Sequence, residues 1–190
     1  PDHATMRSPP STRQARPAAP RSITTRPTPK SLLTRPDPLN TYDFELPNQD
    51  GEPVRLSALR GRTIVLYFYP KADTPGCTTQ ACSIRDRDAD YSAAGVKVIG
   101  VSPDPVAKVK RFHDKQSLNF TLLADADHAV CDDYGVWVEK SMYGRKYRGA
   151  QRSTFIIRPD GIIAHVIPKA SPKTHDDEVL KALGDVGAAT

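Results

Sequence analysis

The order of apolar and polar residues along the chain predicts several β-strands. Residues 42–46 alternate between apolar and polar side chains, and a short Asn-Gln-Asp-Gly turn separates them from residues 54–56, so the two segments predict a β-hairpin. Residues 63–69, with the sequence TIVLYFY, are apolar without alternation, which is typical of a central strand covered on both faces. Residues 96–101 predict a further strand.

Other segments of the chain predict helices. Thr78–Ala94 has a solvent face rich in Arg and Asp and is followed by a glycine, which is a common helix stop. A second helix is expected after Asp104, with Asp104 as its cap and Pro105 at its first position, where the missing N–H costs nothing. We expect a short helix around residues 129–134 and a closing helix over residues 175–183.

The C-terminal half adds an antiparallel pair of strands. Residues 154–157 and 162–166 flank a Pro-Asp-Gly turn, which is a strong hairpin signal, whereas the stretch before them, through Trp137 and Gly144, predicts a long loop. The predicted order is a hairpin, then strand, helix, strand and helix, and finally two strands and a helix. This connectivity predicts an α/β protein with a thioredoxin-like fold, in which a central mixed β-sheet is flanked by helices.

The N-terminal segment differs in composition from the rest of the chain. Residues 1–40 contain nine of the eighteen prolines and no aromatic residue, and their seven Arg or Lys against two Asp account for the whole formal net charge of +5. Such a segment cannot bury enough apolar surface to offset the entropy lost on ordering. We therefore predict a disordered basic extension over residues 1–38 and one folded domain over residues 39–190. Because the rest of the chain is neutral overall, its charge does not indicate nucleic-acid binding.

Several interpretations of this extension stay open. Its Arg- and Ser-rich, acid-poor composition resembles an organelle transit peptide, and the alternatives are a segment without function or an anchor for nucleic acid or an anionic membrane. No apolar run approaches the about 20 residues that span a bilayer, and no secretory signal is recognisable. We expect a cytoplasmic protein without membrane association, or an organellar one if the extension is a transit peptide.

The number and spacing of the cysteines indicate which kinds of site the chain can form. Three of them, an odd number, argue against the disulfide framework of a small secreted protein. A structural zinc site is disfavoured as well, because Cys77 and Cys82 lack the close spacing of zinc ligands and no pair of histidines completes a set. We therefore expect neither a metal nor another cofactor. Cys131, on the predicted short helix, is interpreted as a buried core residue, with a second redox-active thiol as the alternative.

Cys77 lies just after the central strand, in the first turn of the next predicted helix. Unpaired backbone N–H groups and the helix dipole at such a position favour the thiolate, which is the nucleophilic form of cysteine. Thr74, three residues earlier, can direct its hydroxyl toward the sulfur, and Pro70 and Pro75 stiffen the turn. The position predicts a reactive thiol, although an inert buried cysteine at a helix start has the same surroundings.

Cys82 follows Cys77 by five residues, which is about 140° around an ideal helix. The two sulfurs therefore point apart while the helix is intact, and a disulfide between them requires the helix start to unwind. Such a bond suits reversible chemistry better than a structural role. A hydrolase with a cysteine nucleophile and a histidine base is disfavoured, because no local signature accompanies His113, His128 or His165.

At this point the motifs resemble those of a known family. The stretch PKADTPGC, residues 70–77, matches the P-x-x-x-T-x-x-C motif of peroxiredoxins. The stretch GCTTQAC with the following Arg85-Asp86 is similar to the bacterioferritin comigratory protein (PrxQ) branch of that family. Further similarity runs through NFTLLADADHAVCDDYGVW and QRSTFIIRPDG, so that the resemblance covers residues 39–183.

The resemblance implies a role for each matching residue. Cys77 is then the peroxidatic nucleophile, which attacks a hydroperoxide and becomes a sulfenic acid. Thr74 is expected to hydrogen-bond the bound peroxide, and Pro70 to shield the sulfenic acid from over-oxidation. Arg152 matches the active-site arginine of the family, whose fixed charge stabilises the thiolate and the departing oxygen. Cys82 is expected to resolve the sulfenic acid as an intramolecular disulfide.

The same resemblance implies the reaction and its partners. It predicts a thiol peroxidase that reduces hydrogen peroxide and organic hydroperoxides without a cofactor and is itself reduced by thioredoxin or a similar dithiol protein. A monomer is expected, with a weak dimer as the alternative. The competing function is a thiol-based peroxide sensor or chaperone-like protein that uses the same reactive cysteine, and the presence of Cys82 favours turnover.

Overall fold

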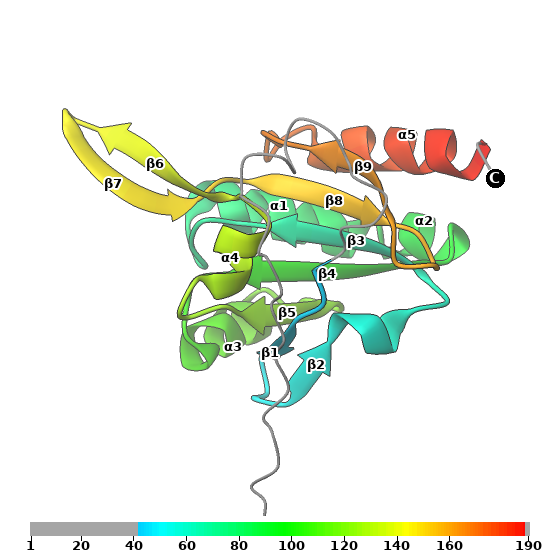
Figure 1. Cartoon of the computed structure of the whole chain (residues 1–190), viewed down its shortest axis with the longest axis horizontal. Helices are drawn as coiled ribbons and strands as arrows, with labels where there is room; N and C mark the ends of the chain where they lie inside the picture. Colours follow the sequence, from blue (N-terminus) through cyan, green and yellow to red (C-terminus); the bar gives the residue numbers. More distant parts are fainter. Residues whose placement is uncertain (1–41, 189–190) are drawn as a thin grey trace, which may run out of the picture.

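A five-stranded mixed sheet lies at the centre of the structure, a computed structural model that describes residues 42–188 (Figure 1). Its strands are β3 (Thr63–Phe68), β4 (Val96–Ser102), β5 (Thr121–Ala124), β8 (Ser153–Ile157) and β9 (Ile163–Ile167). Their order across the sheet is β5-β4-β3-β8-β9. Neighbours among β3, β4 and β5 are parallel, while β8 is antiparallel to both β3 and β9.

Helices and two hairpins complete the described part of the chain. The helices are α1 (Pro75–Asp86), α2 (Asp88–Ala93), α3 (Val106–Lys115), α4 (Ala129–Asp133) and α5 (His175–Ala188), with the short 3-10 helix η2 (Leu56–Leu59). The antiparallel hairpins pair β1 (Glu45–Pro47) with β2 (Pro53–Arg55), and β6 (Trp137–Met142) with β7 (Arg145–Ala150).

The apolar run of β3 is central because both of its faces are covered. Val65 and Tyr67 pack in a cluster with residues of α1, α2, α3 and α5, whereas Leu66 and Phe68 pack on the opposite face with residues of α4 and β1. All four side chains are buried. Since successive side chains of a strand point to opposite faces, a run without polar positions fits a strand in the middle layer of three. The predicted α/β arrangement of a central mixed sheet flanked by helices is confirmed.

Helix α1 differs in its limits from the helix predicted over residues 78–94. It begins at Pro75, whose missing N–H suits the first helical position, so that Cys77 lies inside the first turn. It ends at Asp86, because Arg87 leaves the helical conformation with φ −104° and ψ 21° before α2 begins. Gly95, with φ 66°, follows α2 and ends the helical segment as expected.

The predicted role of Asp104 as a helix cap was wrong. Helix α3 starts at Val106, its cap position is occupied by Pro105, and no side chain caps it. The carboxylate of Asp104 instead accepts hydrogen bonds from the backbone N–H of Ala72 at 2.6 Å and from the hydroxyl of Ser102 at 2.7 Å. The residue therefore ties the loop after β3 to the end of β4, next to the start of α1.

Three strands, β5, β6 and β7, were not predicted from the sequence. Strand β5 has only four residues, too few to show a period, and the region through Trp137 and Gly144 is a hairpin instead of a long loop. Its tip residues Tyr143 and Gly144 both have positive φ, 52° and 76°, as a tight two-residue hairpin turn requires. Because tyrosine is uncommon in that position, the turn carries no strong sequence signal.

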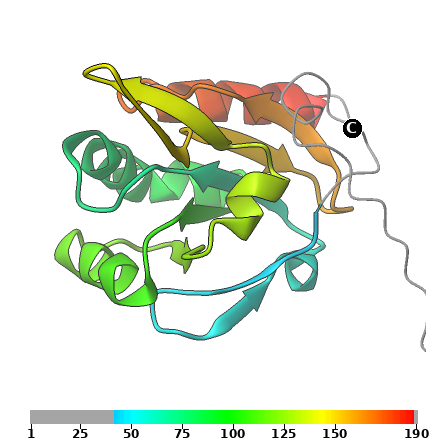
Figure 2. The same cartoon turned by 60° about the vertical axis from the view of Figure 1, so that its left-hand side comes forward.

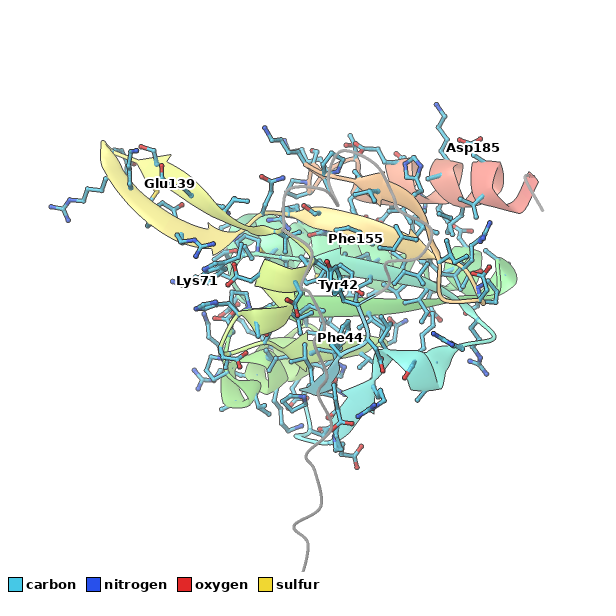
Figure 3. All side chains as sticks on the ribbon, viewed as in Figure 1. Tyr42, Phe44, Lys71, Glu139, Phe155 and Asp185 are labelled. Carbon is cyan, nitrogen blue, oxygen red and sulfur yellow. The ribbon has the colours of Figure 1, made fainter. Side chains whose placement is uncertain are left out.

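The β6–β7 hairpin projects from the body of the molecule (Figures 1 and 2). Glu139 lies on it, and Lys71, in the loop after β3, lies at the same end of the molecule (Figure 3). Near its tip the hairpin carries exposed Met142, Tyr143 and Tyr147. At its base, where β7 leads into β8, Ala150 is fully buried. The hairpin is therefore anchored at the end of the sheet to which the parallel strands β3 and β4 point.

The predictions for residues 1–38 lie outside the described residues. Within residues 42–188, no helix combines the length and apolar character needed to cross a membrane. Cys131 falls inside this range, and the prediction that its side chain is buried in the core is confirmed. The side chain is fully buried in the cluster between α4 and the central sheet. Burial raises the pKa of the Cys131 thiol, and the neighbouring carboxylate of Asp125 raises it further.

Replacing Gly100 by alanine should destabilise the fold. A Cβ atom at this position of β4 would lie 2.7 Å from both Leu122 Cδ2 and the Tyr67 ring, and both of these side chains are fully buried. We expect a loss of about 1–3 kcal/mol in the free energy of unfolding, measured by urea denaturation. Gly149→Ala is the control, because its Cβ would meet no atom closer than 3.5 Å. Equal stability of the two variants would contradict the packing described for β4.

Cys131 should resist alkylation in the folded protein. The thiol is fully buried and its raised pKa keeps it protonated, so iodoacetamide should modify it only after unfolding. Mass spectrometry of peptides from native and urea-unfolded protein measures this directly. Labelling of Cys131 at the rate of the half-buried Cys82 in the native protein would show that the core around α4 opens.

Candidate functional site

The loop between β3 and α1 is fixed by bonds at both of its ends. The backbone N–H of Tyr69 still donates to Val101 on β4 at 3.0 Å, and the half-buried Pro70, which has no N–H to donate, follows directly. Asp73 adopts a left-handed conformation with φ 63° and forms an ion pair with Lys115 at 2.8 Å. Together with the bond from Ala72 to Asp104, these contacts set where α1 begins.

Cys77 is the third residue of α1 and is almost completely buried, with 2% of its surface exposed. Thr74 is the residue before the helix, with extended φ −101° and ψ 153°, and its carbonyl accepts the N–H of Thr78 at 2.8 Å. The N–H groups of the first turn have no partner within the helix and present a partial positive charge at the sulfur. The sulfur of Cys77 therefore lies at the positive end of the helix dipole of α1.

The hydroxyl of Thr74 is not bonded to the sulfur. It donates to the carbonyl of Lys71 at 3.0 Å, across the loop that precedes the helix. The proton of the hydroxyl is therefore engaged, while its oxygen keeps lone pairs that can accept a hydrogen bond from another molecule.

Arg152 brings a fixed positive charge to the same sulfur. Its Nη2 donates to Cys77 Sγ at 3.2 Å, and its Nη1 donates to the side-chain oxygen of Gln80. The arginine lies just before β8, and its own carbonyl accepts the N–H of Ala170 at 3.0 Å, which fixes the backbone there. The planar guanidinium is thus held between two side chains of one helix, Cys77 and Gln80.

Gln80 and Lys140 belong to this site and were not singled out from the sequence. Gln80 is fully buried and lies three residues after Cys77, on the same face of α1, so helical spacing could have indicated it. Lys140, on β6, donates to the carbonyl of Ala150 at 2.5 Å. Burial lowers the pKa of Lys140 and the nearby charge of Arg152 lowers it further, while Cys77 acts in the opposite direction.

Cys82 points away from this group. Its side chain is half buried, and its Sγ lies 3.5 Å from the side-chain oxygen of Gln116, at the end of α3. All three cysteines are free thiols in the structure. In an ideal helix, Cα atoms five residues apart are about 9 Å from each other, whereas a disulfide requires less than about 7 Å. A bond between Cys77 and Cys82 therefore requires the first turns of α1 to unwind.

Of the three histidines considered as catalytic bases, His165 is exposed on β9, and the other two contact residues outside this site. His128 stacks on Trp137 with ring centroids 4.3 Å apart, and His113 lies 3.5 Å from the carboxylate of Asp114. The structure thus brings together Cys77 and Arg152, and it adds Gln80. In residues 42–188, no group of three or more His, Cys, Asp or Glu side chains is placed to hold a metal ion.

Comparisons with known proteins agree with this geometry. Residues 40–166 match the model of the AhpC/TSA family. Peroxiredoxin Bcp of Escherichia coli is 50% identical over 140 residues, which cover 74% of this chain and 90% of the relative.

Solved structures show the same similarity. The bacterioferritin comigratory protein of Xanthomonas campestris, described for its alkyl peroxide reduction activity, has a TM-score of 0.71 and 37% identity, covering 75% of this chain and 90% of its own. A mutant of PrxQ from Xylella fastidiosa has a TM-score of 0.74 and 32% identity, covering 80% and 96%. The thioredoxin-like fold of the peroxiredoxin type is thereby confirmed. The chain belongs to the AhpC/TSA family and, within it, to the bacterioferritin comigratory protein (PrxQ) group of peroxiredoxins, which are thiol peroxidases.

Proposed function

We propose that the protein reduces hydrogen peroxide and organic hydroperoxides with Cys77 as the peroxidatic thiol and Cys82 as the resolving thiol, and that thioredoxin or a similar dithiol protein reduces the resulting disulfide. The observation that carries the proposal is the bond of 3.2 Å from the Arg152 guanidinium to Cys77 Sγ, at the start of a helix. A buried cysteine that only filled the core would not need a fixed cation beside its sulfur.

In the first step, the Cys77 thiolate attacks one oxygen of the hydroperoxide. The S–O bond forms as the O–O bond breaks, the sulfur becomes a sulfenic acid, and the departing oxygen leaves as water or an alcohol after taking up a proton from solvent. Arg152 stabilises the negative charge that moves from the sulfur to the departing oxygen. Because its own proton is engaged with Lys71, Thr74 Oγ1 is suited to accept the O–H of the bound hydroperoxide.

In the second step, the thiolate of Cys82 attacks the sulfenic sulfur of Cys77. The S–S bond forms, and the hydroxyl leaves as water once it has taken up a proton. Since the two sulfurs point to different neighbours, Arg152 and Gln116, this step requires local unwinding of α1. Pro70, at the end of β3, would shield the sulfenic acid until the resolving thiol arrives. A dithiol protein then exchanges with the disulfide and restores both thiols.

Arg152→Lys should slow the reaction with peroxide while leaving the fold intact. Lysine keeps the positive charge but cannot bond Cys77 and Gln80 at once, as the two Nη atoms of the arginine do. We expect the rate of the first oxidation to fall by at least about tenfold, as observed for the loss of one charged hydrogen bond in a reactive site. Stopped-flow fluorescence of the single tryptophan during peroxide addition measures this rate. A rate equal to that of the wild type would show that the paired bonds have no part in the chemistry.

Two serine substitutions test the separate roles proposed for Cys77 and Cys82. Cys77→Ser should abolish turnover in an assay with thioredoxin, thioredoxin reductase and NADPH, because a hydroxyl provides almost no anionic nucleophile at neutral pH. Cys82→Ser should still react once and then stall as a sulfenic acid, which dimedone traps, so that its turnover falls sharply.

Cys131→Ser is the matched control, because the Cys131 thiol is fully buried and takes part in neither proposed step. This variant should turn over like the wild type. Residual turnover above a tenth of wild type in Cys77→Ser would refute the peroxidatic assignment. A wild-type protein that is oxidised by peroxide but never turned over by thioredoxin or another dithiol would point to a peroxide sensor.

A further inference from the structure

A buried carboxylate from the C-terminal helix fastens the second half of α1. The hydroxyl of Ser83 donates to one oxygen of Asp176, on α5, and the hydroxyl of Tyr91, on α2, donates to the other oxygen at 3.0 Å. Asp176 has only 4% of its surface exposed, and the ring of the adjacent His175 lies 3.5 Å away. Burial by itself raises the pKa of Asp176, but the adjacent His175 ring and the bonds from Ser83 and Tyr91 outweigh it and lower the pKa, so the carboxylate is charged at neutral pH.

Further contacts hold the last turn of α1 to the segment around α3. Nη1 of Arg85 donates to the carbonyl of Gln116 at 2.6 Å, and the side-chain amide of Asn119 donates to the carbonyl of Arg85 at 3.3 Å. None of these atoms belongs to the two thiols or to Arg152. Their bonds therefore survive a change in the oxidation state of Cys77.

The first half of α1 is fastened by different means. Arg152 bonds Cys77 and Gln80, and Cys82 contacts Gln116. When Cys77 becomes a sulfenic acid it no longer carries the charge that Arg152 attracts, and when Cys82 attacks it must leave Gln116. The chemistry itself thus weakens the contacts of residues 75–82, while those of residues 83–86 are left intact.

We propose that Asp176 is a positioning residue of the resolving step: through Ser83 it stops the unwinding of α1 directly after Cys82. This inference rests on the proposed resolving role of Cys82. With Ser83 held, the backbone next to Cys82 stays in place, and the released segment around Cys77 swings toward it. The remaining turn, from Ser83 to Asp86, then serves as a template on which the helix forms again when a dithiol reduces the disulfide.

The backbone N–H of Arg87 reports directly on this boundary. It lies 3.2 Å from the carbonyls of both Ser83 and Ile84, beyond the proposed end of the unwound segment. If the clamp holds, the amide of Arg87 stays protected from hydrogen exchange when the protein is oxidised with one equivalent of peroxide, although the amides of residues 77–82 become exposed. In addition, the peptide bond after Arg85 should resist trypsin in the oxidised form.

Ser83→Ala removes the bond to Asp176 without adding bulk. In the oxidised form of this variant the amide of Arg87 should exchange about tenfold faster than in the oxidised wild type, and trypsin should cut after Arg85. The reduced forms should differ far less, because α1 is then continuous from Pro75. A purely structural role of Ser83 would raise exchange equally in both oxidation states.

Three further variants make the test specific. Tyr91→Phe removes a bond to the same carboxylate but leaves α1 attached to it, and should keep the protection of Arg87. Ser83→Thr retains a hydroxyl and should restore it. If Ser83→Ala does not fold, Asp176→Ala, which leaves the Ser83 hydroxyl without its acceptor, should show the same loosening in the oxidised form.

The outcomes separate this inference from the function on which it rests. Unchanged protection of Arg87 in oxidised Ser83→Ala, or its loss already in the oxidised wild type, would overturn the clamp alone. An oxidised wild type in which residues 77–82 remain as protected as in the reduced protein would overturn the resolving role of Cys82, and the clamp with it.

Discussion

The proposed site depends on the position of one guanidinium group, that of Arg152. Arg152 lies between Cys77 and Gln80 and donates to both, so a cation is fixed against a sulfur that is otherwise buried. The arginine reaches this place because β8 runs antiparallel beside β3, which puts the start of β8 next to the end of β3, and α1 begins shortly after that end. Sheet topology, loop and helix start all serve to bring these three side chains together.

The sequence predicted the framework of this arrangement better than its contacts. The apolar run of β3 and the proline-rich turn before Cys77 indicated a thiol at the start of a helix, and the structure has it there. Arg152 follows Cys77 by 75 residues, so no local period connects the two, and only the family motif pointed to it. Helical spacing could have placed Gln80 on the same face of α1 as Cys77, but its role as a partner of Arg152 is visible only in the three-dimensional structure.

Other features were missed for reasons of local physical chemistry. Strand β5 is too short to show a period, and the turn of the β6–β7 hairpin uses Tyr143 and Gly144, both with positive φ, where Asn-Gly would have been recognised. Lys140 lies on that hairpin, close enough to Arg152 and Cys77 for their charges to act on its pKa. Aspartate is a common helix cap, which is why Asp104 was expected to cap α3. The helix begins one residue later than expected, after Pro105, and the Asp104 carboxylate bonds the loop after β3 instead.

The proposed function depends on helix α1, which carries the proposed peroxidatic thiol, Cys77, and holds the proposed resolving thiol, Cys82, away from it. The measurement that tests it most directly is peptide mapping of the full chain after oxidation with one equivalent of hydrogen peroxide under non-reducing conditions. The proposed roles of the thiols predict one linked pair, Cys77 with Cys82 within a single chain, and an unmodified Cys131. A bond from Cys77 to Cys131, a bond to a second chain, or an unoxidised Cys77 would contradict it.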